Sequence, residues 1–408
     1  MCLACLMGCT SSEEVVPEPE KQKLDVELVP CMTAYEDLEP VAKGKEPEAA
    51  QSRKVALTRA WLPPSGFSII SGTENNSIGI CFTQNGQAPE TGYFFTSSGK
   101  WRSSVEITSA DTYYLYGYTP HVPGVSCEIS SSDTPGDNSA YSEGAVLTIK
   151  DISTVTPNDV CVVVGAKNGM ADYTESGDYE VTGLQQGNFE YAAVPTGGSS
   201  STPGVGNYAY LLFDHLFSAL RLNFSVNTTY AALRNIKLTE LSLRTYTDPS
   251  DPESVNTKTF NVTITLQKTA DGSSPIAKGG SGEDLITFTP TGEKDYAGTP
   301  FYQNPDGKEL PVYPAFDTFV AHYVPVGVTK LILKSKYDVY DRNVTAEHPD
   351  GNLIRKDCIA ENTINLSMFS GQSQSLRGRR YNINLTVKPS YLYVMSDDDL
   401  NNPTLVVN

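Results

Sequence analysis

Apolar and polar residues alternate along several stretches in the second half of the chain. Residues 216–226, 260–266 and 381–387 each place apolar side chains at most alternate positions, with Asn, Thr, Ser or Arg between them. Successive side chains of an extended strand point to opposite faces, so this period of two buries one face and leaves the other in water. The pattern predicts antiparallel strands that lie with one face on a core.

The first half contains shorter apolar segments that are separated by turn-forming residues. Asn-Gly, Ser-Gly and Pro-Gly pairs lie among segments of strand-like composition, which are residues 67–70, 78–82, 112–118, 145–149 and 160–164. The last of these contains Cys161, which we expect to be a small buried hydrophobic residue. Many short strands at these spacings predict an all-β fold of the sandwich type.

The chain is long enough to form two domains. Its 408 residues exceed what one hydrophobic core usually organises. Residues 196–204 are rich in Gly and Ser and are typical of a linker. We therefore expect an N-terminal β-sandwich domain over residues 60–206 and a C-terminal β-sandwich domain over residues 207–408.

The charge balance excludes one class of partner. Lys and Arg number 30 against 48 Asp and Glu, which gives a formal net charge of −18. Nucleic-acid-binding proteins carry a basic footprint for the phosphate backbone. We expect no nucleic-acid partner.

The first nine residues differ from the rest of the chain. Leu6-Met7-Gly8-Cys9 matches the lipobox of a bacterial lipoprotein, in which a signal peptidase cuts before a cysteine that becomes lipid-modified. The apolar region before Cys9 is short and has no Lys or Arg, so we expect that the true start lies upstream of Met1. The competing interpretation is a metal site at Cys2, Cys5 and Cys9, which lacks nearby His partners. Residues 1–9 are thus predicted to be a lipoprotein signal and Cys9 to be the lipidated residue.

Residues 10–59 form an acidic, proline-bearing leader. It contains strand-like stretches at residues 24–29 and 55–57, and it ends just before Trp61-Leu62-Pro63-Pro64. Such a segment is either a linker from a lipid anchor or a pro-segment that carries a removable strand. Because the proline pair cannot continue a regular ladder, we expect the bond between Arg59 and Ala60 to lie in an accessible loop. Arg53 and Lys54 are alternative cleavage positions.

Motifs that carry catalysis are missing from the sequence. The four histidines form no metal-binding pair at helical spacing, and no nucleophile elbow or phosphate-binding loop occurs. We therefore predict no catalytic residues, no metal site and no cofactor. An acid-dependent hydrolase on a β-sandwich stays open as an alternative, because absent motifs do not exclude an enzyme.

Several segments resemble the fimbrillin family of Bacteroidetes. Residues 213–226 contain His215 followed by an apolar alternating strand, although the inner pair of the family pattern differs here. Residues 378–389 resemble the penultimate strand of the family, and residues 391–403 resemble its closing segment. Together with the lipobox, the acidic leader and Thr58-Arg59-Ala60, the layout covers nearly the whole chain.

The resemblance implies a structural protein with two antiparallel, transthyretin-like β-sandwich domains in tandem. Members of the family are exported as lipoproteins to the outer membrane and trimmed by an arginine-specific protease. They then assemble with identical or related pilin subunits into a surface fimbrium that serves adhesion. Assembly is by β-strand exchange, in which an extended donor segment fills a groove in a neighbour. For this chain the resemblance implies cleavage between Arg59 and Ala60 and a donor segment 391–408, with Leu392, Val394, Leu405 and Val407 as the candidate groove-filling side chains.

Another class of function remains open. The chain could be a non-polymerising surface lipoprotein or a tip adhesin that binds carbohydrate or protein. Residues 113–118 contain four tyrosines whose rings could stack on sugars. Alternate tyrosines in a strand are also typical of half-buried sheet residues.

Overall fold

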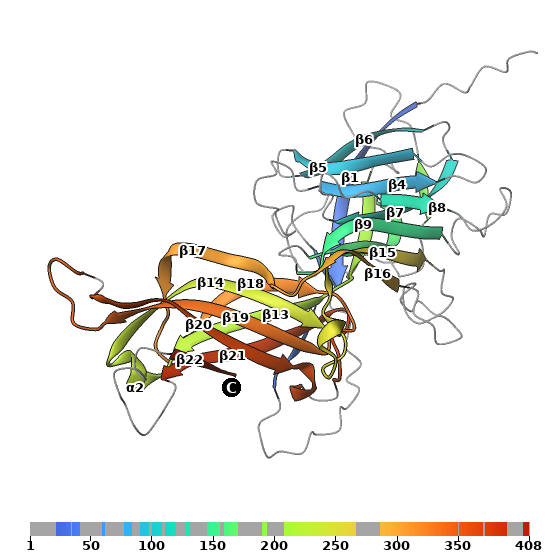
Figure 1. The fold of residues 1–408 in the computed structure, drawn as a ribbon. Helices are drawn as coiled ribbons and strands as arrows, with labels where there is room; N and C mark the ends of the chain where they lie inside the picture. Colours follow the sequence, from blue (N-terminus) through green and yellow to red (C-terminus); the bar gives the residue numbers. More distant parts are fainter. Residues whose placement is uncertain are drawn as a thin grey trace, which may run out of the picture.

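A computed structural model describes a large part of the chain. The described residues are 22–33, 35–40, 59–61, 77–83, 90–97, 100–107, 111–119, 127–130, 145–155, 159–169, 190–193, 208–266, 286–349, 351–369, 372–389 and 403–407. Strands dominate these residues, so the prediction of an all-β fold is confirmed. Figure 1 shows the strands in two groups.

The first group contains a nine-stranded sheet, here the β1 sheet. Its order is β10-β12-β1-β6-β5-β4-β7-β11, with β3 paired to β1 outside this path. A short β10–β7 pairing joins the first strand of this order to its next-to-last strand. The strands are β1 (Gln22–Thr33), β3 (Arg59–Trp61), β4 (Ser77–Thr83), β5 (Glu90–Ser97), β6 (Lys100–Ile107), β7 (Asp111–Thr119), β10 (Cys161–Gly169), β11 (Glu190–Ala193) and β12 (Tyr208–His215).

Three four- or five-stranded sheets complete the fold. The β15 sheet has the order β16-β15-β9-β8, the β14 sheet has the order β17-β14-β19-β20, and the β21 sheet has the order β18-β13-β21-β2 with β22 also paired to β21. Their strands are β2 (Glu36–Leu38), β8 (Cys127–Ser130), β9 (Ala145–Ser153), β13 (Ser218–Val226), β14 (Arg234–Tyr246), β15 (Thr257–Leu266), β16 (Ile286–Lys294), β17 (Thr299–Glu309), β18 (Asp317–Val324), β19 (Lys330–Asp341), β20 (Leu353–Asn365), β21 (Arg379–Pro389) and β22 (Pro403–Val407).

Helices are short and few in the described part of the chain. They are the α-helix α2 (Thr228–Ala231) and the 3-10 helices η2 (Pro252–Ser254) and η3 (Leu366–Met368). None of the helices among the described residues is long and apolar enough to span a bilayer.

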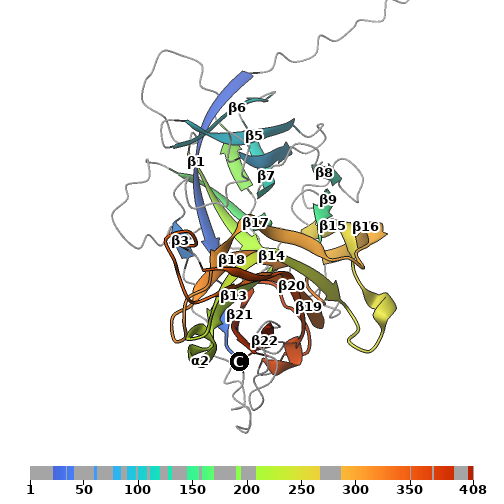
Figure 2. The ribbon, with the colours of Figure 1, turned by 60° about the vertical axis from the view of Figure 1, so that its left-hand side comes forward.

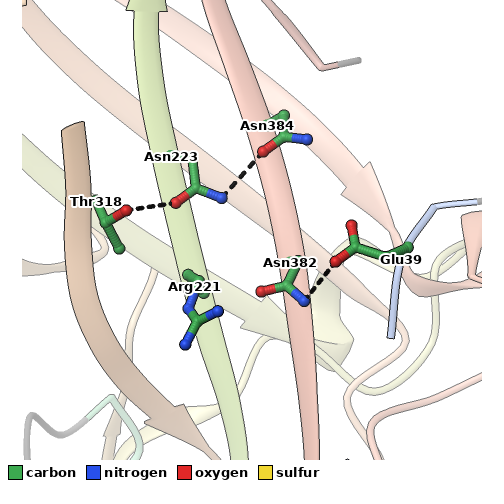
Figure 3. A pocket seen from close by; sticks show the side chains of 6 residues that line it. All are labelled: Glu39, Arg221, Asn223, Thr318, Asn382 and Asn384. Carbon is green, nitrogen blue, oxygen red and sulfur yellow. Dashed lines mark hydrogen bonds between the residues drawn. The ribbon is translucent and has the colours of Figure 1, made fainter. Parts of the chain in front are cut away.

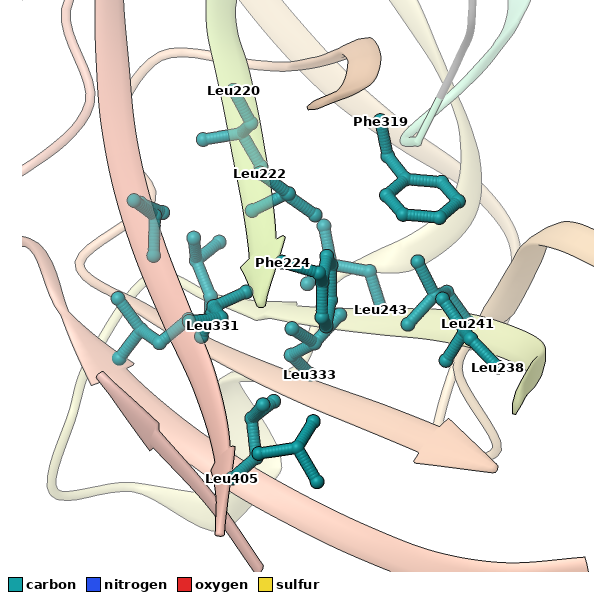
Figure 4. Close-up of a cluster of buried hydrophobic side chains, with 14 of the residues drawn as sticks. Leu220, Leu222, Phe224, Leu238, Leu241, Leu243, Phe319, Leu331, Leu333 and Leu405 are labelled. Atoms are coloured by element: carbon teal, nitrogen blue, oxygen red, sulfur yellow. The ribbon is translucent and has the colours of Figure 1, made fainter. Parts of the chain in front are cut away.

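Two hydrophobic cores lie between the sheets. The first core is formed by side chains of the β1 and β15 sheets, including Val163, Phe213 and Val262. The second core lies between the β21 and β14 sheets, where leucines of β13 face leucines of β14 and β19 (Figure 4). Face-to-face packing of two sheets over an apolar layer is the sandwich arrangement that the alternation predicted.

The alternation itself is confirmed along β15, where Phe260, Val262 and Ile264 are buried and the strand pairs antiparallel with β9 and β16. Along β21 the four apolar residues from Tyr381 to Val387 are buried as expected, but Asn382 and Thr386 of the polar face are buried too. The expected antiparallel pairing is also wrong there, because β21 runs parallel to both β13 and β2. Residues 216–226 instead do not form one strand. β12 ends at His215 and β13 begins at Ser218, so the chain crosses from the β1 sheet to the β21 sheet between them. Leu216 and Phe217 are both fully buried at this crossing, which breaks the period of two.

Strands from both halves of the sequence share the sheets of the first group. β12 pairs with β10 and β1, and β15 pairs with β9. The first group of sheets therefore contains strands from both sides of the boundary predicted after residue 206. Whether residues 60–206 and 207–408 fold as separate units stays a prediction.

The aromatic cluster of the first core provides a test of the packing. The ring centroid of Phe217 lies 5.7 Å from that of Phe260 and 6.4 Å from that of Phe288. Phe217→Ala should lower the free energy of unfolding by about 3–5 kcal/mol, since it opens a cavity at a fully buried site. Phe288→Ala is the matched control and should cost less, because Phe288 is only partly buried. Urea denaturation of both variants checks this, and equal losses would contradict the assignment of Phe217 to the centre of the core.

Candidate functional site

The strand-like stretch at residues 24–29 of the leader lies inside β1, in the interior of the β1 sheet. Residues 22–28 of β1 pair antiparallel with β6, and residues 27–32 pair parallel with β12. Figure 2 shows β1 as the long blue strand that runs from the upper group of strands toward the lower group. Without β1, the facing edges of β6 and β12 would both present unpaired backbone groups.

The predicted cleavage position lies in a short strand. Arg59 and Ala60 belong to β3, which pairs antiparallel with residues 31–33 of β1. The expectation of a loop at this bond is therefore wrong. The extended backbone of β3 satisfies part of the hydrogen bonding of β1, which a loop could not do. Among the described strands, β3 pairs with β1 alone.

The leader continues after β1 into residues 35–40, here called the leader clasp, which contact both cores. Tyr35 packs against the first core, and Leu38 packs against the second. The Tyr35 ring stacks on His215 with 3.7 Å between ring centroids, and its hydroxyl donates to Asp159 Oδ1 at 2.7 Å. Burial, and after it the nearby Asp159 carboxylate, raise the pKa of the Tyr35 phenol well above its usual value, so the hydroxyl keeps its proton.

The leader clasp also pairs with the edge of β21. β2 runs parallel to β21, with Asp37 opposite Arg380. The Arg380 guanidinium donates from Nε and Nη2 to the two Asp37 carboxylate oxygens at 2.5 and 2.6 Å, and Arg379 forms an ion pair with Glu36. Bidentate pairing of this kind fixes the relative orientation of the carboxylate and the guanidinium and also pairs their charges. The clasp is thus aligned on β21 by main-chain and side-chain contacts together.

The C-terminal strand occupies another part of the same edge. β22 pairs antiparallel with residues 385–389 of β21, whereas β2 pairs with residues 379–381. Leu405 is 2 % exposed and lies in the second core beside β20, whose Asn362 Nδ2 donates to the Leu405 carbonyl at 2.6 Å. Val407 lies opposite Leu385 in the ladder. One edge of β21 therefore pairs with the leader along one part and with the C-terminal strand along another.

Several predicted site residues lie outside the described residues. These are Cys9, Leu392 and Val394. The structure brings together Leu405, Val407 and the end of β21, and it brings Arg59 and Ala60 to β1. His215, which carried the family resemblance, ends β12 and is buried, with 2 % of its surface exposed.

A pocket of about 390 Å³ lies beside the leader clasp on the polar face of the β21 sheet (Figure 3). Its lining is polar throughout and consists of Glu39, Arg221, Asn223, Thr318, Asn382 and Asn384. Asn382 Nδ2 donates to Glu39 Oε1 at 2.7 Å, and Asn223 links Thr318 to Asn384. Asn382 Oδ1 is buried and has no hydrogen-bond partner within the described part of the chain.

Two of the four tyrosines in residues 113–118 do not fit a sugar-stacking surface. Tyr116 is 0 % exposed and Tyr118 is 2 % exposed, and both lie in the first core. These tyrosines have the structural role that alternate tyrosines in a strand often have.

Sequence reasoning missed the residues of the leader clasp. Tyr35, Asp37 and Glu39 lie in a segment interpreted only as leader. An acidic pair at Glu36-Asp37 and a basic pair at Arg379-Arg380 are the signal that could have suggested the contact, but 343 positions separate Asp37 from Arg380. Opposite charges that far apart in a sequence specify no pairing.

A comparison with solved structures returned matches of low similarity. The chain is similar to a structure named "putative cell adhesion protein" from Bacteroides uniformis ATCC 8492, at 10 % identity and a TM-score of 0.33, with 95 % of this chain and 97 % of that chain covered. A similarly named structure from Bacteroides ovatus ATCC 8483 matches at 11 % identity and a TM-score of 0.34, with 94 % and 95 % covered. A fimbrial protein from Bacteroides vulgatus ATCC 8482 matches at 11 % identity and a TM-score of 0.29, with 81 % and 91 % covered.

No protein-family profile and no curated protein matches the chain. The structural neighbours match at TM-scores of 0.33, 0.34 and 0.29. Their identities and TM-scores are too low to transfer any residue role.

The ion pair of Asp37 predicts a pH dependence. The hydrogen bonds from Arg380 lower the pKa of Asp37 below its ordinary value of 3.8. The stabilisation is therefore fully present above that ordinary value and is lost as the pH falls through the lower, folded-state pKa. Because the pair is partly exposed, Asp37→Asn should cost less than about 1 kcal/mol at pH 7. Thermal unfolding of both proteins between pH 7 and pH 3 measures this: the gap should shrink toward the acid end, and a constant gap would contradict the assignment.

Proposed function

We propose that the chain is a subunit of a surface fimbrium that assembles by β-strand exchange. The observation that carries the proposal is the position of β1. A segment of the leader, which the sequence predicts to be removable, supplies an interior strand of the β1 sheet and pairs with strands on both sides.

Removal of such a strand would create an acceptor groove. The facing edges of β6 and β12 would lose their main-chain partners, and an unsatisfied buried backbone group costs about 1–3 kcal/mol. An extended segment from a second subunit that restores the ladder would regain this free energy, as in other cases of strand addition. The precursor is kept monomeric because its own β1 fills the groove.

The C-terminal segment is the proposed donor. β22 lies at an edge of the β21 sheet and is the last described strand of the chain. Its exchange would require Leu405 to leave the second core and the five-residue ladder with β21 to open. A strand that pairs within its own subunit in the monomer and with a neighbouring subunit in the polymer is exchanged as in domain swapping.

Export and activation complete the proposal. Lipid on Cys9 would anchor the precursor in the outer membrane, since two acyl chains give stable anchoring. An arginine-specific protease would cut between Arg59 and Ala60, in the short edge strand β3. This separates the leader, including β1 and the leader clasp, from the rest of the chain. The polymer would consist of identical or related pilin subunits at the cell surface, where it serves adhesion.

Variants at Arg59 test the activation step. Arg59→Ala precursor treated with an arginine-specific protease should keep its leader and stay monomeric, because the acceptor groove remains filled. Arg53→Ala is the matched control and should mature and polymerise as the wild type does. Gel electrophoresis of unheated samples measures the ladder of polymers. Polymers of normal length from Arg59→Ala would refute cleavage at this bond as the trigger.

Deletion of residues 401–408 tests whether the C-terminal segment is the donor. The shortened subunit should still lose its leader and accept a strand, but it cannot donate one. Mixed with wild-type subunits, it should shorten the polymers in proportion to its share. Unchanged polymer length would mean that the donor lies elsewhere in the chain.

The polar pocket beside the leader clasp favours a second candidate function, binding of an acidic saccharide. Arg221 could pair with a carboxylate, and the amides of Asn223, Asn382 and Asn384 could bind hydroxyls. Arg221→Ala should then abolish binding to an oligosaccharide that contains uronic acid. Arg244→Ala, which removes an exposed ion pair with Glu361 on the β14 sheet, is the control and should bind normally. Calorimetry measures the binding, and no heat from the wild type would exclude this function.

A further inference from the structure

Three side chains that commonly bind metals meet where β10 begins and β12 ends. Cys161 is the first residue of β10 and lies opposite His215, the last residue of β12, in their antiparallel ladder. Asp159 lies two residues before Cys161, so an extended backbone directs both side chains to the same face. The register of two strands therefore places one carboxylate, one thiol and one imidazole together.

Their ligand atoms are close enough to share one ion. His215 Nδ1 lies 2.9 Å from Asp159 Oδ2 and 3.5 Å from Cys161 Sγ, and one ligand atom from each residue lies within 4.8 Å of the others. In a tetrahedral zinc site with Zn–N near 2.0 Å and Zn–S near 2.3 Å, neighbouring nitrogen and sulfur ligands lie about 3.5 Å apart. The 3.5 Å between Nδ1 and Sγ matches that geometry, and the 2.9 Å between Nδ1 and Oδ2 would widen to about 3.3 Å around the ion.

One nitrogen atom lies beside both an oxygen and a sulfur atom in this cluster. His215 Nδ1 is near the Asp159 carboxylate and the Cys161 sulfur, and the Cys161 thiol also donates weakly to the Asp159 carbonyl at 3.7 Å. A cation positioned among the three atoms would interact with all of them. Cys161 is 0 % exposed and His215 is 2 % exposed, so such an ion would be shielded from competing ligands in water.

The leader clasp supports the cluster from outside. The Tyr35 hydroxyl donates to Asp159 Oδ1, which leaves Oδ2 toward His215, and the Tyr35 ring covers the imidazole. Metal sites commonly have such outer hydrogen bonds, which orient the ligating carboxylate, and losing one typically weakens binding about 10–100-fold.

We propose that Asp159, Cys161 and His215 bind one Zn²⁺ ion, with Tyr35 orienting the Asp159 carboxylate. A mixed sulfur, nitrogen and oxygen set suits Zn²⁺ and disfavours Mg²⁺ and Ca²⁺, which prefer oxygen ligands alone. The ion would join β10 to β12 at the point where the chain crosses to the β21 sheet. The proposal does not depend on polymer formation.

The test uses the full chain, freed of metal by a chelator and then titrated with Zn²⁺ against a chromophoric competitor. The wild type should bind one Zn²⁺ per chain at this site, and Cys161→Ala and Asp159→Asn should each weaken binding by at least about 100-fold. Cys358→Ala is the matched control, because Cys358 is also a buried free cysteine and is absent from the cluster. It should bind as the wild type does.

Cobalt substitution identifies the ligand directly. Co²⁺ bound to the wild type and to Cys358→Ala should show a near-ultraviolet band from sulfur-to-metal charge transfer, and Cys161→Ala should lack it. Asp159→Asn keeps the size of the side chain, so it still tests the site if the Cys161→Ala protein fails to fold. Absence of Zn²⁺ binding by the wild type would overturn the proposal. So would equal affinity in all four proteins, which would move the ion to other residues such as Cys2, Cys5 and Cys9.

Discussion

The double ladder of β1 is the interaction on which the rest of the structure depends. β1 pairs with β6 along its first half and with β12 along its second half, so it joins strands that are about one hundred residues apart in the chain. Main-chain hydrogen bonds carry this contact, and they place few demands on side-chain identity. A strand held in this way can be replaced by another extended segment of suitable length. That property links the fold to the proposed assembly.

The leader clasp and the C-terminal strand extend the same theme to the second core. Both lie along one edge of β21, and each contributes an apolar side chain, Leu38 or Leu405, to the layer beneath. The edge is thereby covered in the monomer, which protects it from uncontrolled pairing with other chains. Loss of the leader would uncover the part of β21 that β2 now holds. Processing at Arg59 would therefore change both groups of sheets at once, although the cut is made at only one bond.

Local patterns predicted the parts of this structure that local physics determines. The alternation at residues 260–266 and 381–387 specified buried faces, and the leader island at residues 24–29 became part of β1. The strand break at Leu216 and Phe217 was not predicted, because both residues are apolar like the strand residues around them. Only the crossing between sheets separates β12 from β13. Arg59 was expected in a loop. Its place in a strand depends on the pairing of β3 with β1, and the residues around Arg59 do not reveal where β1 lies. The meeting of Asp159, Cys161 and His215 depends on the register of β10 against β12, which no spacing along the sequence reveals.

Hydrogen exchange at the two neighbours of β1 tests the central claim most directly. The amides of β6 and β12 that face β1 should be protected in the precursor. After protease treatment and removal of the leader fragment, they should exchange rapidly, while the amides of β19 between β14 and β20 should keep their protection. Addition of a peptide with the sequence of residues 391–408 should restore the protection of β6 and β12. If those amides remain equally protected after the leader has gone, β1 does not fill an exchangeable groove and the account is wrong.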